Sequence, residues 1–174
     1  MKIPPLPWRR IVPGLVAIAG LTAVLHWSPG RQVRLHQRHF LAAVENRDWK
    51  KTGPFIASNY RDQWGQDRPL VLRRLPEIFG DFVVLGVLSE NPSVSWADGN
   101  GIVTSHIRVV GRGGPIAQAI IARSAELTQP FAMEWRRQSW RPWDWQLVAV
   151  KQPELEPPAH FDAGAEFEEW RPTR

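Results

Sequence analysis

Apolar side chains recur at helical spacing in the first half of the chain and alternate at strand spacing after about residue 80. The first helical pattern begins at Ser28–Pro29, because serine caps a helix and proline suits its first position. The apolar residues behind it lie mostly on one helical face: Val33, Phe40, Leu41 and Val44. Asn46 and Asp48 end this helix and offer a cap for the next.

Two further helical segments are predicted before residue 80. A short, irregular helix runs through Ile56, since an interior Gly53–Pro54 costs a hydrogen bond and clashes with the preceding turn. Asp67 caps a third helix, RPLVLRRLPEIF, with Pro69 in its first turn. We expect Pro76 to kink this helix or to end it early.

From Gly80 onward the residues favour strands joined by turns. The sequence DGNG at 98–101 is a strong hairpin signal. We expect Gly111–Gly114 to break the strand that follows and Pro115–Leu127 to form a helix. The predicted strands are Phe82–Leu88, Ser93–Trp96, Ile102–Val110, Phe131–Gln138 and Trp143–Val150. Three helices before a mainly antiparallel sheet indicate an α+β fold.

The last two strands share the stretch WRRQSWRPWDW (135–145), which holds four of the ten tryptophans and three arginines. Its two strand segments meet at a turn over Ser139–Pro142. Strand alternation places Trp135, Trp143 and Trp145 on the side of a core or pocket. The residues expected to face outward are Arg136, Gln138, Asp144 and Gln146. Trp140, at the turn, is the tryptophan expected to be exposed.

Charge is spread unevenly along the chain, whose net charge is +5. Six acids and two bases follow Pro153, so residues 1–152 hold 20 bases and 11 acids. Such a basic balance can favour nucleic acid or anionic lipid. Glu134 and Asp144 interrupt the bases of the tryptophan-rich stretch, however, and its indoles are expected in the core. We therefore expect no nucleic-acid partner, and the same objection applies to a membrane-lying segment here.

The acids gather in residues 153–174, which are also rich in proline. We predict that this acidic segment is a disordered tail. The absence of cysteine excludes disulfides, zinc–thiolate sites and thiol nucleophiles, but it does not select a compartment.

Residues 11–27 carry no acid, lysine or arginine, and 17 positions are the low end of what a bilayer core needs. A basic tail, residues 1–10, precedes this run. The flanking residues are those of a membrane anchor: Trp8, Arg9, Arg10 and Trp27. An uncleaved transmembrane anchor is favoured over a cleaved signal peptide, because no small-residue cleavage site follows, and over a buried core helix.

The bases before this run favour a single-pass topology with the N-terminus in the cytoplasm. The C-terminal domain is then expected outside the cytoplasm, at an inner or plasma membrane. Arg31, Arg34 and Arg38 follow the run and weaken this orientation.

Three segments resemble the nuclear-transport-factor-2-like (NTF2-like) superfamily, which includes the SnoaL and ketosteroid-isomerase folds. FLAAVENRDW (Phe40–Trp49) resembles the opening helix and the turn after it. NYRDQWG (Asn59–Gly65) resembles the segment before the third helix, and WDWQLVAV (Trp143–Val150) resembles the last strand. The resemblance covers about residues 31–152.

The resemblance implies a cone in which N-terminal helices pack on a curved antiparallel sheet, with a pocket between them. Superfamily members include isomerases, cyclases, dehydratases and non-catalytic interaction modules, and they are often dimers. An anchor followed by such a domain also resembles membrane-bound secretion scaffolds and Mce-associated proteins. Fold alone does not choose among these functions.

A catalytic cone needs an acid or base in its pocket, and Asp62, Tyr60, His106 and Glu134 are the candidates. His106 shares a strand face with Ile102, Thr104 and Arg108, the less apolar of the two faces, so it is expected on the wetter side. Asp62 lies in a polar turn, where aspartate usually bonds its own backbone. The expected pocket walls are Tyr60, Trp64, Trp135, Trp143 and Trp145.

No cofactor or metal is expected. His36 and His39 share a helix face but have no cysteine, aspartate or glutamate beside them to complete a metal site. GRGG is neither a dinucleotide-binding nor a P-loop sequence.

Two functions therefore stay open. The favoured one is a membrane-anchored binding or assembly module, acting as a homodimer or in a protein complex. The alternative is a small-molecule lyase or isomerase that uses a polar residue in the cone pocket.

Overall fold

The computed structural model describes Gly14, Gly20 and residues 28–155. The predictions for the basic tail, for the anchor with Trp8, Arg9, Arg10 and Trp27, and for residues 156–174 therefore lie outside the described residues. Within the described part, no helix combines the length and apolarity needed to span a bilayer.

The opening helix, α2 (Pro29–Glu45), confirms the start and end predicted from the sequence. Pro29 occupies its first turn, although the Ser28 side chain makes no capping hydrogen bond. Its buried side chains form one face: Gln32, Val33, Gln37, Phe40, Leu41, Ala43 and Val44. This is the spacing of a helix that packs against a larger surface.

Two short elements and a longer helix follow α2. The carboxylate of Asp48 accepts a hydrogen bond from the Lys51 amide at 3.1 Å and caps α3 (Trp49–Thr52), which leads into the 3-10 turn η1 (Gly53–Phe55). Asp67 caps α4 (Arg68–Phe79) in the same way, through the Leu70 amide at 3.0 Å. The expected early end at Pro76 is wrong, because α4 continues to Phe79. Pro76 has no amide hydrogen to donate to the Leu72 carbonyl, so it costs α4 one hydrogen bond without ending the helix.

The longest elements are the two strands of one hairpin, β1 (Phe82–Ala97) and β2 (Asn100–Gly113). Asp98 and Gly99 both have positive φ, 51° and 77°, as the predicted two-residue turn requires. The runs predicted as two strands, 82–88 and 93–96, are one strand interrupted by a bulge between Glu90 and Ser93.

The sequence predicted that Gly111–Gly114 would break this strand, and that prediction is wrong. The strand continues to Gly113, and Gly111 has a φ of 136°. A Cβ atom at Gly111 would lie 2.0 Å from the Val84 carbonyl oxygen, so only glycine lets β1 approach this closely.

The predicted helix after this hairpin is present as α5 (Pro115–Glu126). β3 pairs only with residues 101–105 of β2, and α5 covers the edge beyond them. There the Ser124 hydroxyl accepts a hydrogen bond from the Val109 amide at 3.0 Å. The Asp81 carboxylate holds the start of α5 through the Ala117 amide, also at 3.0 Å. The helix thus protects a strand edge that could otherwise pair with another chain.

The sheet is completed by β3 (Phe131–Arg137) and β4 (Trp145–Lys151), in the antiparallel order β1-β2-β3-β4. A bulge in β4 places both Leu147 and Val148 in buried positions. The last strand starts at Trp145, so the prediction that it starts at Trp143 is wrong. Trp143 belongs to the preceding loop and is 51% exposed.

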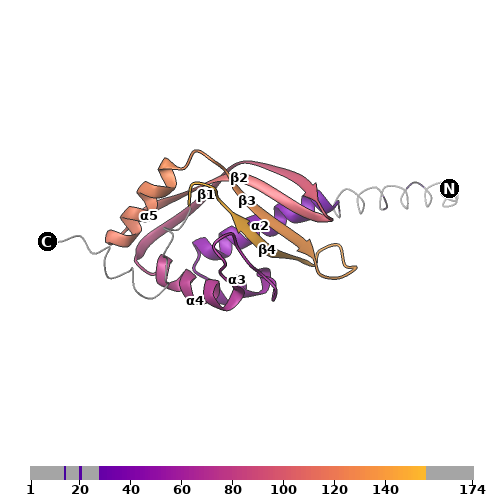
Figure 1. Cartoon of the computed structure of the whole chain (residues 1–174), viewed down its shortest axis with the longest axis horizontal. Coiled ribbons are helices and arrows are strands. Elements are labelled where there is room, and N and C mark those ends of the chain that lie inside the picture. The colour runs from indigo at the N-terminus through magenta and orange to yellow at the C-terminus, as the bar shows by residue number, and fades with distance from the viewer. Residues whose placement is uncertain (1–13, 15–19, 21–27, 156–174) are drawn as a thin grey trace, which may run out of the picture.

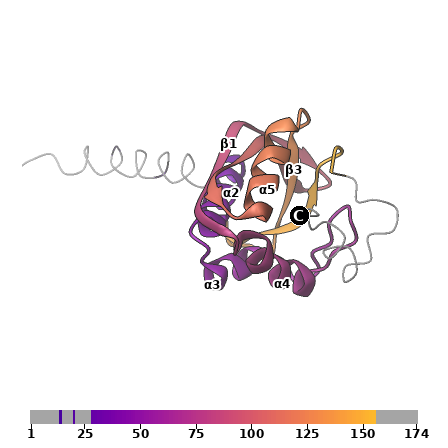
Figure 2. The ribbon, with the colours of Figure 1, turned by 90° about the vertical axis from the view of Figure 1, so that its left-hand side faces the viewer.

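The helices lie on the inner face of the curved sheet, with α2 across its centre (Figures 1 and 2). This is the predicted α+β arrangement. The main core lies between α2 and the inner side chains of β2, β3 and β4: Val33, Phe40, Leu41, Val44, Ile56, Tyr60, Val103, Ile107, Met133, Trp135, Trp145 and Leu147. A smaller core joins Ala117 of α5 to Phe82 and Leu85 of β1.

A pair of valines in the same hairpin tests where the core lies. Val103 is fully buried and Val83 is 69% exposed. We expect Val103→Ala to lower the free energy of unfolding by about 2 kcal/mol, from lost burial and the cavity left behind. Val83→Ala should change it by less than about 0.5 kcal/mol. Urea unfolding of both variants checks this, and equal losses would show that the inner face is misassigned.

Candidate functional site

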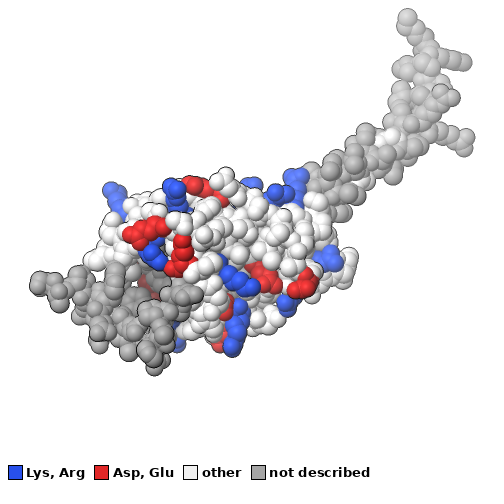
Figure 3. All heavy atoms as spheres, turned by 45° about the horizontal axis from the view of Figure 1, so that its top comes forward, with Lys and Arg blue, Asp and Glu red and all other residues white. Residues whose placement is uncertain are grey.

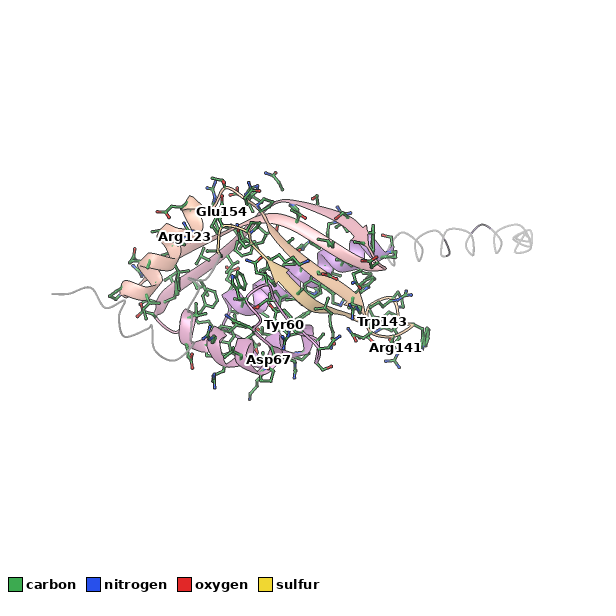
Figure 4. The ribbon with its side chains drawn as sticks, viewed as in Figure 1. Tyr60, Asp67, Arg123, Arg141, Trp143 and Glu154 are labelled. Carbon is green, nitrogen blue, oxygen red and sulfur yellow. The ribbon has the colours of Figure 1, made fainter. Side chains whose placement is uncertain are left out.

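The structure brings two of the candidate residues, Tyr60 and Asp62, together in the segment between η1 and α4. This segment runs beside β4 and bonds to its outer edge, with Ala57 and Arg61 amides donating to the Leu147 and Val148 carbonyls at 3.0 Å each. Tyr60 is 5% exposed and points into the molecule (Figure 4). Asp62 is 8% exposed.

The Asp62 carboxylate closes the polar turn predicted from the sequence. Its Oδ1 atom accepts hydrogen bonds from the amides of Trp64 at 3.0 Å and Gln66 at 2.8 Å. The Asp62 amide in turn donates to the Gln66 carbonyl at 3.2 Å. The Tyr60 hydroxyl donates to the same carboxylate. Asp62 thus accepts hydrogen bonds from the backbone amides of its own loop, as aspartate does in many turns.

Burial governs the electrostatics of this pair. It raises the pKa of the Asp62 carboxyl above its usual value, against the hydrogen bonds from Gln66, Trp64 and Tyr60 and the charge of Arg74, all of which lower that pKa. Burial also raises the pKa of the Tyr60 hydroxyl strongly, and the neighbouring Asp62 charge adds to the increase. Tyr60 is therefore a neutral donor throughout the physiological range.

A buried carboxyl with a raised pKa has the property needed by a general acid. Acid catalysis also requires that the carboxyl reach a substrate. Asp62 is 8% exposed, and its Oδ1 atom accepts hydrogen bonds from two backbone amides. The pair therefore has the geometry of a structural turn more than of a proton donor.

His106 does not join this pair. It lies on β2 opposite Glu90 of β1, on the outer face of the sheet together with exposed Arg108, as the alternation predicted. Glu134, the other candidate, also lies on the outer side and accepts a hydrogen bond from the Asn100 side chain at 2.6 Å. The four candidates are thus divided between two sides of the sheet.

The tryptophans expected to line a pocket differ in their surroundings. Trp135 is fully buried and Trp145 is 5% exposed. The ring of Trp135 contacts His36 and Phe40 edge to face, with centroids 6.2 and 6.1 Å apart. Trp64 is half-buried, and its indole donates to the Leu155 carbonyl. The alternation predicted Trp143 on the side of the core or pocket, but it lies in the loop before β4 and is 51% exposed.

One polar pair inside the core was not predicted. The Gln37 side chain of α2 donates to the Ser105 hydroxyl of β2 at 3.0 Å, and both residues are buried. Among the described residues, two buried polar atoms have no hydrogen-bond partner, Gln37 Oε1 and Trp135 Nε1. The sequence pattern that pointed to a buried polar contact was Ser105, which stands between Val103 and Ile107 on the apolar face of its strand.

The chain after β4 is also held by contacts that the sequence did not reveal. The Gln152 side chain donates to the Gln129 carbonyl at 2.6 Å, and the Gln152 backbone amide donates to Gln63 Oε1 at 2.8 Å. The Glu154 carboxylate accepts hydrogen bonds from Thr128 and from the Gln129 amide, which lower its pKa. Residues up to Leu155 therefore pack on the domain.

The two histidines of α2 lie in different surroundings. His36 is bonded to the Gln32 carbonyl at 2.8 Å and packs on Phe55, while His39 is exposed. Across the residues that the structure describes, no group of three potential metal ligands occurs. The shallow surface depression formed by Asn46–Lys51 lies at the turn from α2 into α3, away from the core of the cone.

Comparison with known proteins identifies the fold. No protein-family model matches the chain, and no curated protein does. A solved NTF2-like protein of unknown function from Pseudomonas putida has a TM-score of 0.51 and 14% identity, over 70% of this chain and 82% of that one. The fold is NTF2-like.

Two other solved structures superpose comparably. A candidate aromatic ring hydroxylase from Novosphingobium aromaticivorans has a TM-score of 0.53 and 11% identity, over 72% of this chain and 87% of that one. Bd1075 from Bdellovibrio bacteriovorus has a TM-score of 0.53 and 9% identity over 70% of this chain, which spans 38% of the Bd1075 chain. At such low identities the superpositions show a shared fold and carry no activity with it.

The raised pKa of Asp62 makes a prediction about pH and stability. A raised folded-state pKa means that the folded state holds this proton more tightly than the unfolded state does. The wild-type protein should therefore lose free energy of unfolding as pH rises from about 3.8 through the folded-state pKa. Asp62→Asn keeps an oxygen for the two amides and cannot ionise. Its free energy of unfolding should therefore not show this decrease as pH rises.

Urea unfolding of both proteins between about pH 4 and about pH 7 measures the difference. Tyr60→Phe is the companion variant, because it removes a hydrogen bond that lowers the pKa of Asp62. The free energy of unfolding of this variant should continue to fall up to a higher pH than that of the wild type. If the free energy of unfolding of the wild type instead rises relative to that of Asp62→Asn as pH increases, the charged carboxylate is the form that the fold stabilises.

Proposed function

We propose that the chain is a membrane-anchored NTF2-like module that binds or assembles with other proteins and does not itself catalyse a reaction. The observation that carries this proposal is the packing of the inner face of the sheet. The inner side chains of the central strands, Val103, Met133 and Trp135, are at most 5% exposed, beneath α2. Side chains packed this closely offer little accessible surface to a substrate between α2 and these strands.

The ionisable candidates support the same proposal. Asp62 is bonded to its own turn, while His106 and Glu134 lie on the outer side of the sheet. A catalytic set needs its acid, base and orienting groups within hydrogen-bond reach of one reacting atom. The described candidates do not converge in that way.

The outer face of the β1–β2 hairpin is the surface that supports protein binding. Val84, Leu88 and Val110 are 47%, 46% and 39% exposed there. Gly86 pairs with Val110, whose side chain covers it, so the apolar strip continues across both strands. The described helices pack on the opposite face. Exposed apolar patches on a sheet face commonly mark an interface.

The sequence supports the anchor in this proposal. Residues 11–27 contain no Asp, Glu, Lys or Arg and end shortly before α2, which begins at Pro29. The bases at 2, 9 and 10 favour a domain outside the cytoplasm, at an inner or plasma membrane.

Membrane fractionation tests the anchor. We expect the full chain to remain in the membrane pellet after alkaline carbonate washing, because an apolar span is held by the bilayer and not by charge. A protease added to intact spheroplasts or cells should cleave the domain if it lies outside the cytoplasm. Release of the intact chain by carbonate would contradict the anchor.

Site-specific photo-crosslinking tests the assembly surface. A photoreactive residue in place of Arg108, which lies opposite Leu88, should give a specific adduct in native membranes, either with a second copy or with another protein. Leu88→Glu should reduce that adduct about tenfold or more, since an unpaired charge would be buried in the contact.

Gln118→Glu is the matched control for that variant, because it adds the same charge on the exposed side of α5. It should leave the adduct unchanged. Absence of any adduct at Arg108, or an equal loss in both variants, would contradict an interface on the outer face.

A further inference from the structure

The loop between β3 and β4 displays two tryptophans on a fixed turn. Trp140 is 82% exposed and Trp143 is 51% exposed, with Arg141 between them. The turn is held closed by hydrogen bonds from the Gln138 amide to the Asp144 carbonyl at 2.8 Å and from the Trp145 indole to the Pro142 carbonyl at 2.9 Å. These indoles are therefore presented by a structured loop.

A third exposed tryptophan lies at the same end of the molecule. Trp96, near the tip of the β1–β2 hairpin, is 49% exposed, and its ring centroid is 5.9 Å from that of Trp145. The same tip rests on the first turns of α2, since a Cβ atom at Gly101 would lie 2.9 Å from a methyl group of Val33. Trp143 and Arg141 lie at this end in Figure 4.

Arginines surround these indoles. Arg31 and Arg34 are exposed on the first turns of α2, and Arg137 and Arg141 are exposed at the β3–β4 loop. None of these four takes part in an ion pair within 4.0 Å among residues 28–155. The acids nearby in the sequence are Asp98, Glu134 and Asp144, so the four arginines outnumber them. Blue side chains lie beside the start of the described chain in Figure 3.

We propose that this end of the domain docks on the surface of an anionic lipid bilayer. Trp140 and Trp143 would enter the headgroup layer, where indoles are favoured because one part is apolar and the N–H is polar. The four arginines would contact lipid phosphates. This proposal rests on the anchor proposed above, because the uncharged run 11–27 joins α2 at this same end and holds the indoles near the membrane.

The placement of Trp143 decides between this surface and an ordinary core. Had β4 begun at Trp143, its indole would have faced the inner side of the sheet with Trp145. The strand begins two residues later, and the loop instead adds Trp143 to Trp140 at the surface. The stretch WRRQSWRPWDW therefore divides into a buried pair, Trp135 and Trp145, and an exposed pair.

The absence of cysteine permits a direct test of docking. A single spin label on Ser139→Cys, between the loop residues, is compared with one on Gln118→Cys of α5. The full chain is reconstituted in vesicles of phosphatidylcholine with phosphatidylglycerol. Docking predicts that the Ser139 label becomes more accessible to lipid-soluble oxygen and less accessible to a water-soluble nickel chelate. The Gln118 label should stay in water.

Three variants and two conditions separate the contributions. Trp140→Ala with Trp143→Ala should return the Ser139 label to water, and far-UV circular dichroism checks that these exposed substitutions leave the fold intact. Arg137→Gln and Arg141→Gln should each reduce the ratio of docked to undocked label about fivefold. Salt at about 1 M, or phosphatidylcholine alone, should weaken docking, because screening shortens the reach of the arginine charges.

Vesicle flotation, measured in parallel, distinguishes this proposal from the anchor. A chain that floats while the Ser139 label remains as exposed to water as the Gln118 label overturns docking and leaves the anchor intact. A chain that floats only while Trp140 and Trp143 are present supports docking and overturns the anchor. A chain that does not float overturns both. A Ser139 label shielded from oxygen and nickel alike shows a protein contact there and overturns lipid docking.

Discussion

The whole domain depends on the contact between the buried face of α2 and the inner face of the sheet. Val33 and Phe40 on α2 lie against Val103 of β2 and Trp135 of β3, and all four are at most 7% exposed. Burying these side chains removes a large apolar area from water, and the packing is dense enough that each shape matters. The curvature of the sheet around this helix then fixes which strand residues face inward, and so which residues remain for function.

The local pattern was sufficient for those elements whose boundaries depend on neighbouring residues. The caps at Asp48 and Asp67 and the turn at Asp98–Gly99 follow from side chains that bond their own backbone or from a required positive φ, and the start of α2 follows from Pro29 in its first turn. Gly111 and Trp143 were misplaced for a different reason. Their positions depend on a strand from elsewhere in the sequence or on a turn that closes through Trp145, and a local pattern does not contain those partners.

The candidate site shows the same division. Tyr60 and Asp62 are two residues apart, so their meeting in one turn could be anticipated, and alternation alone placed His106 on the outer face. The bond between Gln37 and Ser105 joins residues 68 positions apart, and the clamp on Glu154 comes from the turn before β3. Such pairs depend on how α2 and α5 pack against the sheet, which a local pattern does not contain.

The clamp on Glu154 also determines where the acid-rich segment begins. Arg123 donates to the Glu154 carbonyl at 2.7 Å, and both residues lie at the opposite end of the domain from Trp143 and Arg141 in Figure 4. The described domain thus begins at an end that is rich in arginine. It finishes near the opposite end, where the sequence continues with several acids. The Glu154 clamp and the proposed docking surface therefore lie at opposite ends of the described domain. In the docked orientation, Glu154 would lie on the side facing water, away from the arginines that meet the lipid phosphates.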